Sequence, residues 1–197
     1  RLQTDYVDLY QMHIQDPDTP IDETLRALDD AVKDGKVRYI GLSNFAPWRI
    51  ADAQWTAKHN GYTPFISSQP EYSMLERGVE RAVLPVSEKY GLGTLPFFPL
   101  AHGFLTGKYR RNEAVPENTR LALTPAAQEK RLSDANFDIL DQLEVFVEKR
   151  GHTMRVQARL IRFARTQLLP SGSLLPTRWL NLTAFWADSS VTEFLDR

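Results

Sequence analysis

Four polar residues stand where short apolar runs of the sequence end: His13, Ser43, Asn44 and Gln69. The runs before them are rich in strand-forming residues, which is typical of buried β-strands. In parallel α/β folds, functional groups collect at the carboxyl ends of the strands, because the loops there vary over a rigid scaffold. A neutral imidazole N–H can stabilise an oxygen that gains charge, and hydroxyl and amide groups supply donors and acceptors without charge. The same rule selects the loop from Phe97 to Lys108.

Other interpretations of these residues remain open from residue type alone. His13 could be a structural residue that closes a strand, and Ser43 with Asn44 could cap a helix that begins near Pro47. His13, Asp16, Asp18 and Glu71 could ligate a metal by type, but their spacing matches no recognised motif, so no metal is expected. The absence of cysteine excludes thiol nucleophiles and zinc–thiolate sites.

The elements that position these residues alternate along the chain. Strands are predicted over 6–13, 37–44, 64–69 and 92–98, and helices over about 19–35, 47–60, 79–90 and 125–150. Thr19 is expected to cap the first helix, since Pro20 and Asp22 follow it. In the last helix we expect an apolar stripe of Ile139, Leu140, Leu143 and Val147.

Alternating strands and helices predict parallel pairing through right-handed crossovers, hence an α/β fold. The strand ends at His13, Asn44, Gln69 and Phe97 lie 31, 25 and 28 residues apart, about one β/α unit each. A closed (β/α)8 barrel needs about 250 residues, and only four strand-type units are visible. The sequence therefore predicts a partial (β/α)8 TIM barrel, whose open edges favour self-association.

Four motifs resemble, in order and spacing, the middle strands of aldo-keto reductases. They are Asp5–His13, Gly41–Phe45, Gln69–Tyr72 and the segment from Pro96 to Tyr109, and together the resemblance covers residues 1–154. It places the visible strands as the fourth to seventh of the family's eight. It also implies a nicotinamide cofactor, NADP(H) first and NAD(H) second, and a small-molecule carbonyl substrate.

The resemblance implies a role for each strand-end residue. His13 takes the position of the family's active-site histidine, which orients the substrate carbonyl and donates a hydrogen bond to it. Ser43, Asn44 and Gln69 take the positions that bind the nicotinamide carboxamide. Phe97 takes the position whose aromatic ring stacks on the nicotinamide.

The segment after Phe97 resembles the family's pyrophosphate-binding loop, where close backbone approach and a cation suit phosphate. Its expected cofactor-binding residues are Phe98, Pro99, Leu100, Ala101, Lys108 and, by a looser alignment, Arg120. His102 stands where many relatives carry a small residue; it could touch the cofactor or face solvent, and no role is assigned to it.

Two parts of the family pattern are missing from this sequence. The resemblance implies that the family's proton-donating tyrosine, with its lysine and aspartate, belongs to the first three strand units, before Arg1. Tyr10 cannot replace this tyrosine, because it lies three residues from His13 on the same strand and its side chain therefore faces the opposite way. After Met154 the amino-acid composition changes and the sequence shows no clear period. Residues 155–197 are therefore predicted to be a divergent tail from a frameshift or fusion. We therefore expect a reductase fragment that is inactive or weakly active alone; the alternative is a non-catalytic cofactor-binding or regulatory module.

Composition limits the other function classes. The chain has 197 residues, is 42% hydrophobic and 25% charged, and carries a formal net charge of −1. These values fit one globular unit and provide no overall field that would attract nucleic acid or an anionic membrane. Without cysteine or a membrane-spanning run, a cytoplasmic location is expected.

Overall fold

The computed structural model describes residues 3–149, 151, 152 and 154. These residues form two compact units. The first comprises residues 3–71 and Gly78–Phe97, and the second comprises Tyr72–Arg77 and the described residues from Phe98 onward. The tail predicted over 155–197 lies outside the described residues.

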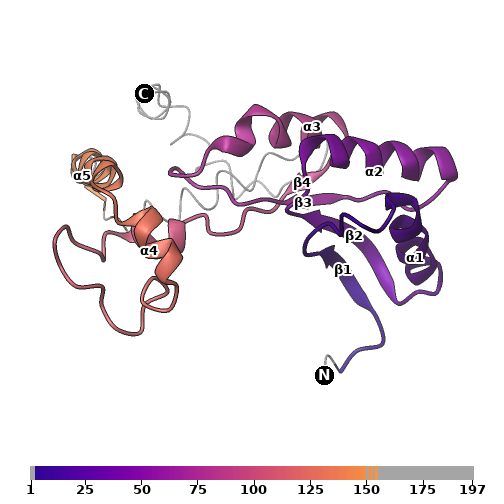
Figure 1. Cartoon of the computed structure of the whole chain (residues 1–197), viewed down its shortest axis with the longest axis horizontal. Coiled ribbons are helices and arrows are strands. Elements are labelled where there is room, and N and C mark those ends of the chain that lie inside the picture. The colour runs from indigo at the N-terminus through magenta and orange to yellow at the C-terminus, as the bar shows by residue number, and fades with distance from the viewer. Residues whose placement is uncertain (1–2, 150, 153, 155–197) are drawn as a thin grey trace. The chain divides into compact units, whose positions relative to one another are not determined.

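The first unit is built on four parallel strands, β1 (Val7–Met12), β2 (Val37–Ser43), β3 (Ser67–Gln69) and β4 (Gly93–Thr94). Their order in the sheet is β1-β2-β3-β4, so each strand pairs with its neighbour in the sequence (Figure 1). This consecutive order differs from that of a doubly wound sheet, in which the strand order reverses at a switch point. The predicted parallel α/β sheet is confirmed.

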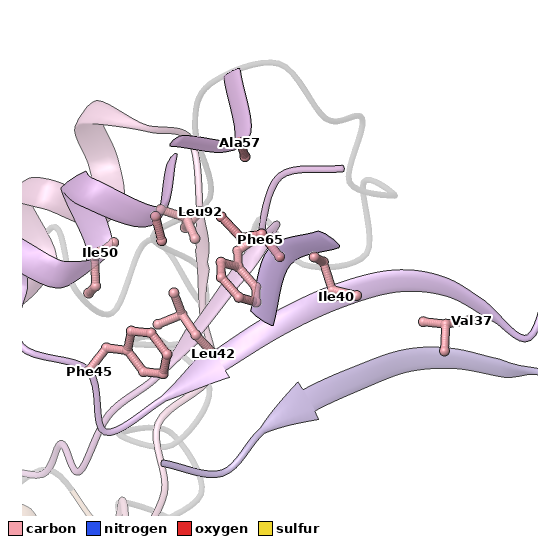
Figure 2. Close-up of a cluster of buried hydrophobic side chains, with 10 residues drawn as sticks. Val37, Ile40, Leu42, Phe45, Ile50, Ala57, Phe65 and Leu92 are labelled. Atoms are coloured by element: carbon pink, nitrogen blue, oxygen red, sulfur yellow. The ribbon is translucent and has the colours of Figure 1, made fainter. Parts of the chain in front are cut away.

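Three helices pack against the sheet: α1 (Ile21–Lys33), α2 (Pro47–Asn60) and α3 (Val83–Lys89). Their apolar side chains share one core with Ile40 and Leu42, which point from β2 toward Phe65 and Leu92 (Figure 2). Because side chains alternate along a strand, Gly41 and Ser43 belong to the opposite face. In that face Gln11, Gly41, Ser67 and Gly93 are in register across the four strands.

The boundaries of α2 agree with the prediction for local reasons. Pro47 occupies the first turn, where its missing N–H leaves no bond unmade, and Gly61 ends the helix at φ 70°.

The prediction of a Thr19 cap is wrong: the N-cap of α1 is Pro20 without a side-chain cap, and the Thr19 hydroxyl donates to Asp16 Oδ2 at 2.7 Å.

The single helix predicted over 79–90 is wrong. The structure has a 3-10 helix, η1 (Gly78–Arg81), and then α3, with Ala82 at φ −147° between them. Pro85 explains the break, since in a continuous helix its ring would clash with the carbonyl of Arg81 and it has no N–H to donate.

The strand predicted over 92–98 shortens to β4, although the chain continues beside β3. The N–H groups of Leu95 and Phe97 donate to the carbonyls of Ser68 and Pro70, both at 2.9 Å. Pro96, between them, has no N–H, so the regular ladder stops.

The second unit packs the 3-10 helix η2 (Ala101–Thr106), α4 (Pro125–Arg131) and α5 (Asp134–Glu148) around an apolar cluster. The helix predicted over 125–150 is therefore two helices, because Ser133 caps α5 by accepting from the N–H of Asn136. Leu140, Leu143 and Val147 are buried as predicted, whereas Ile139 is 36% exposed and Phe137 takes its place in the core. No helix in the described part of the chain is long and apolar enough to cross a membrane.

A buried carboxylate ties α1 to the loop before β3. Asp29 is 2% exposed and accepts hydrogen bonds from the N–H of Thr63 at 2.9 Å and from its hydroxyl at 2.8 Å. The Nζ of Lys33 lies 2.6 Å from Asp29 Oδ2. Together with the Thr63 N–H, this ammonium group holds the pKa of Asp29 below its ordinary value.

Candidate active site

The ends of β1, β2 and β3 bring together the first group of predicted residues. The Ser43 hydroxyl donates to the carbonyl of Gln69 at 2.7 Å, which joins the ends of β2 and β3. The Asn44 amide donates from Nδ2 to the carbonyl of His13 at 2.9 Å, which joins β2 to the end of β1. The same Nδ2 donates to Ser43 Oγ at 3.1 Å. Thus His13, Ser43, Asn44 and Gln69 form one connected group, as expected from parallel strand ends.

The capping interpretation of Ser43 and Asn44 is wrong. The N-cap of α2 is Ala46, with no side-chain cap bond. Asn44 has φ 57°, a left-handed conformation that asparagine tolerates better than most residues. This conformation turns its amide back toward β1 instead of forward to the helix.

Phe97 is linked to the same group through its backbone. Its N–H donates to the carbonyl of Pro70, the residue after Gln69, and Phe97 pairs with Glu71 in a parallel bridge. The half-buried Phe97 is therefore held beside the end of β3.

The site contains one residue that the sequence analysis missed. Gln11 of β1 donates from Nε2 to Gln69 Oε1 at 3.2 Å and accepts from Ser67 Oγ at 3.2 Å. These bonds cross over Gly41, where a Cβ atom would overlap the Gln11 amide and the Ser67 hydroxyl. A glycine inside a strand pattern signals such a close approach, and it is the signal that could have found this network.

The second group of predicted residues lies in the second unit, in a loop with unusual backbone geometry. Phe98, Ala101 and His102 have φ angles of 49°, 48° and 59°, and Gly103 has φ 88°. Several non-glycine residues in this conformation cost about 1 kcal/mol or more each, and such strain concentrates at functional sites.

Two cations flank this loop. The Nζ of Lys108 lies beside Gly103, 3.0 Å from where a Cβ atom would stand, so the absence of a side chain there makes room for the ammonium group. Arg120 lies with its guanidinium 5.4 Å from the centre of the Phe98 ring. Both cations are exposed and therefore accessible to an anionic ligand.

His102 does not face solvent, which was one of the two open interpretations. It is 9% exposed, and its ring lies 3.8 Å from the ring centre of Phe98. The metal interpretation gains no support either: no three His, Asp or Glu side chains among the described residues are placed to hold a metal ion.

The sequence profile described as the Aldo/keto reductase family matches residues 1–174. The chain belongs to this family. Among the curated relatives, an uncharacterized oxidoreductase of Bacillus subtilis is 46% identical over 114 residues, 58% of this chain and 35% of the relative. The versiconal hemiacetal acetate reductase of Aspergillus parasiticus is 34% identical over 149 residues, 76% of this chain and 43% of the relative.

A third relative and a solved structure extend the similarity. The L-glyceraldehyde 3-phosphate reductase of Escherichia coli O157:H7 is 35% identical over 167 residues, 80% of this chain and 46% of the relative. The structure of a glycerol dehydrogenase from Gluconobacter oxydans matches with a TM-score of 0.65 and 26% identity, covering 94% of this chain and 60% of that one. The chain spans less than half the length of these three curated relatives.

Proposed function

We propose that the chain is the cofactor-facing part of an aldo/keto reductase whose complete form transfers a hydride from NADPH to an aldehyde or ketone. NADH is the second candidate cofactor. The observation that carries the proposal is the connected group of His13, Ser43, Asn44 and Gln69 at the carboxyl ends of adjacent parallel strands.

The atoms left over in this group fit a carboxamide. No described residue donates a hydrogen bond to Asn44 Oδ1, and none accepts one from Gln69 Nε2. The group therefore offers one acceptor and one donor, and a carboxamide presents an amino group and a carbonyl. The nicotinamide supplies the hydride when it is bound; Asn44 and Gln69 hold its amide, and Phe97 offers an aromatic surface for its ring.

In this proposal His13 orients the substrate. Its position is fixed by the bond from Asn44 to its carbonyl. An imidazole N–H directed at the substrate oxygen stabilises the charge that develops there during reduction.

The second group of residues is proposed to hold the cofactor's pyrophosphate. The backbone of Phe98, Pro99, Leu100 and Ala101, strained at Phe98 and Ala101, gives a close approach, and Lys108 and Arg120 provide positive charge.

The sheet is proposed to be part of a TIM barrel, its strands being the fourth to seventh of eight. Consecutive parallel order supports this, as does the small and polar row formed by Gln11, Gly41, Ser67 and Gly93 on the face away from the helices. Tyr39, also on that face, is 53% exposed. Such open surfaces and strand edges are expected to drive self-association, which size-exclusion chromatography would reveal.

The proton donor for the reaction is proposed to lie outside this chain. Tyr10 pairs in register with Ile40, whose side chain is in the core under the helices, so Tyr10 faces away from Gln11 and His13. Loss of a positioned acid costs about 10²–10⁴-fold in rate. We therefore expect the chain alone to bind cofactor with little or no turnover, which is also how a regulatory binding module would behave.

The test combines titration of cofactor fluorescence with an assay of carbonyl-dependent NADPH oxidation. Saturable binding with turnover supports a reductase, and binding without turnover supports the incomplete reductase or the binding module. A chain that shows neither property contradicts the proposal. Joining the chain to the first half of a relative's barrel distinguishes the last two functions, since only an incomplete reductase gains turnover.

A further inference from the structure

We infer that Gln11 is a positioning residue that fixes which end of the Gln69 amide is presented to the cofactor. This inference rests on the proposed function. It starts from the bond between Gln11 Nε2 and Gln69 Oε1, 3.2 Å long, which joins two side chains 58 residues apart on strands that are not neighbours in the sheet.

The Gln11 amide has a second partner on its other side. Ser67 Oγ lies 3.2 Å from Gln11 Oε1 and donates to it. With its oxygen turned to Ser67, Gln11 directs its nitrogen, which can only donate, at Gln69. The Gln69 oxygen must then face Gln11, so the Gln69 nitrogen faces away as a free donor.

Gly41 makes this arrangement possible. The Gln11 side chain crosses β2 at this position, because a Cβ atom on residue 41 would lie 2.6 Å from Gln11 Cδ and closer still to its oxygen. Strand β2 thus lets a side chain of β1 reach β3. Gln11 is half-buried, and its bonds to Ser67 and Gln69 hold its side chain across β2.

The consequence is directional recognition. A Gln69 that presents only N–H recognises the carbonyl oxygen of the nicotinamide carboxamide and leaves the amino group to Asn44. Without Gln11, the Gln69 amide could rotate by 180° and offer its oxygen instead.

The experiment uses the oxidised cofactor and its 3-acetylpyridine analogue, which keeps the carbonyl oxygen but has no amino group. Gln11→Glu preserves the size of the side chain and the acceptor for Ser67, but an ionised carboxylate cannot donate. Gln69 must then turn its nitrogen inward and its oxygen outward. The carboxamide can rotate and donate from its amino group to this oxygen, whereas the acetyl group has no donor in any orientation.

We expect Gln11→Glu to weaken binding of the acetylpyridine analogue at least fivefold more than binding of the parent cofactor, the loss expected for about one hydrogen bond. In a Gln69→Leu background the same substitution should leave the ratio of the two affinities unchanged. A merely structural role for Gln11 would weaken both probes equally.

A second readout needs no cofactor. Gln11→Leu removes the donor, so the side-chain amide signal of Gln69 in NMR spectra of the free chain should shift and broaden. An unchanged affinity ratio or an unchanged Gln69 signal would overturn the inference while leaving the proposed function intact. Failure of the unmodified chain to bind either probe would instead contradict the proposed function, and this inference with it.

Discussion

Asn44 donates a hydrogen bond to the carbonyl of His13 at 2.9 Å while its own backbone stands at φ 57°. A strained residue thus joins the ends of two neighbouring strands at the point where the proposed substrate and cofactor meet. The relationship gives a way to separate what Asn44 does for the fold from what it does for binding.

We predict that two substitutions of Asn44 differ in their effect on stability. Asn44→Ala removes the tether and keeps the left-handed strain, whereas Asn44→Gly removes the tether and adopts this conformation freely. The glycine variant should be more stable than the alanine variant by about 1 kcal/mol in urea unfolding. Both should lose cofactor affinity to the same degree, and a glycine variant that binds like the unmodified chain would show that the Asn44 side chain does not touch the cofactor.

Gly41→Ala should destabilise the first unit by about 1–3 kcal/mol, because the new methyl group overlaps Gln11 and Ser67. Thermal unfolding measures the loss. Adding Gln11→Ala and Ser67→Ala should recover part of it by removing the overlapping atoms. If Gly41→Ala alone is neutral, the crossing of Gln11 over β2 is wrong.

Asp29 gives a prediction about pH. Its pKa is lowered by Lys33 and Thr63, so its stabilising contribution is fully present above the ordinary carboxyl value of 3.8 and is lost as the pH falls below that value toward the folded pKa. Stability of the unmodified chain should therefore fall in this acid range, and that of Asp29→Asn should fall less. Parallel curves for the two proteins would contradict the assignment.

Asp29→Ala should cost about 2 kcal/mol at neutral pH, since it leaves the N–H of Thr63 without its acceptor. Lys33→Met is the matched comparison, because the Lys33 side chain is 66% exposed and its loss should cost much less. Urea unfolding of both variants measures the difference.

Lys108→Met should weaken cofactor binding about tenfold or more, the loss expected for one charged hydrogen bond to phosphate. It should also reduce the dependence of binding on salt. Lys58→Met, an exposed lysine on α2, is the control and should leave the affinity unchanged. Equal effects of the two substitutions would show that Lys108 acts only through overall charge.

The sequence predicted those features that depend on local chemistry. Pro47 and Gly61 mark the ends of α2, and the apolar runs locate all four strands in their order. His13, Ser43, Asn44 and Gln69 could be grouped because parallel strands align their carboxyl ends. Where a single proline or serine interrupts a periodic pattern, as at Pro85 and Ser133, the pattern alone overestimated the length of a helix.

The tertiary partners could not be predicted in this way. Gly41 signals a close approach, but the sequence near Gln11 does not indicate Gln69 as its partner, because that contact depends on the register of three strands. The bond between Asp29 and Thr63 is similar, since it depends on how α1 packs on the loop before β3. In both cases the local sequence shows a polar residue, and only the fold shows its partner.

We propose that Gln69 and its neighbours bind the nicotinamide. Fluorescence titration of NADPH with the unmodified chain, with Gln69→Leu and with the exposed control Gln3→Leu tests it most directly. We expect saturable binding that Gln69→Leu weakens at least fivefold and Gln3→Leu leaves unchanged. Absence of binding to the unmodified chain, or equal affinity in all three proteins, would contradict it.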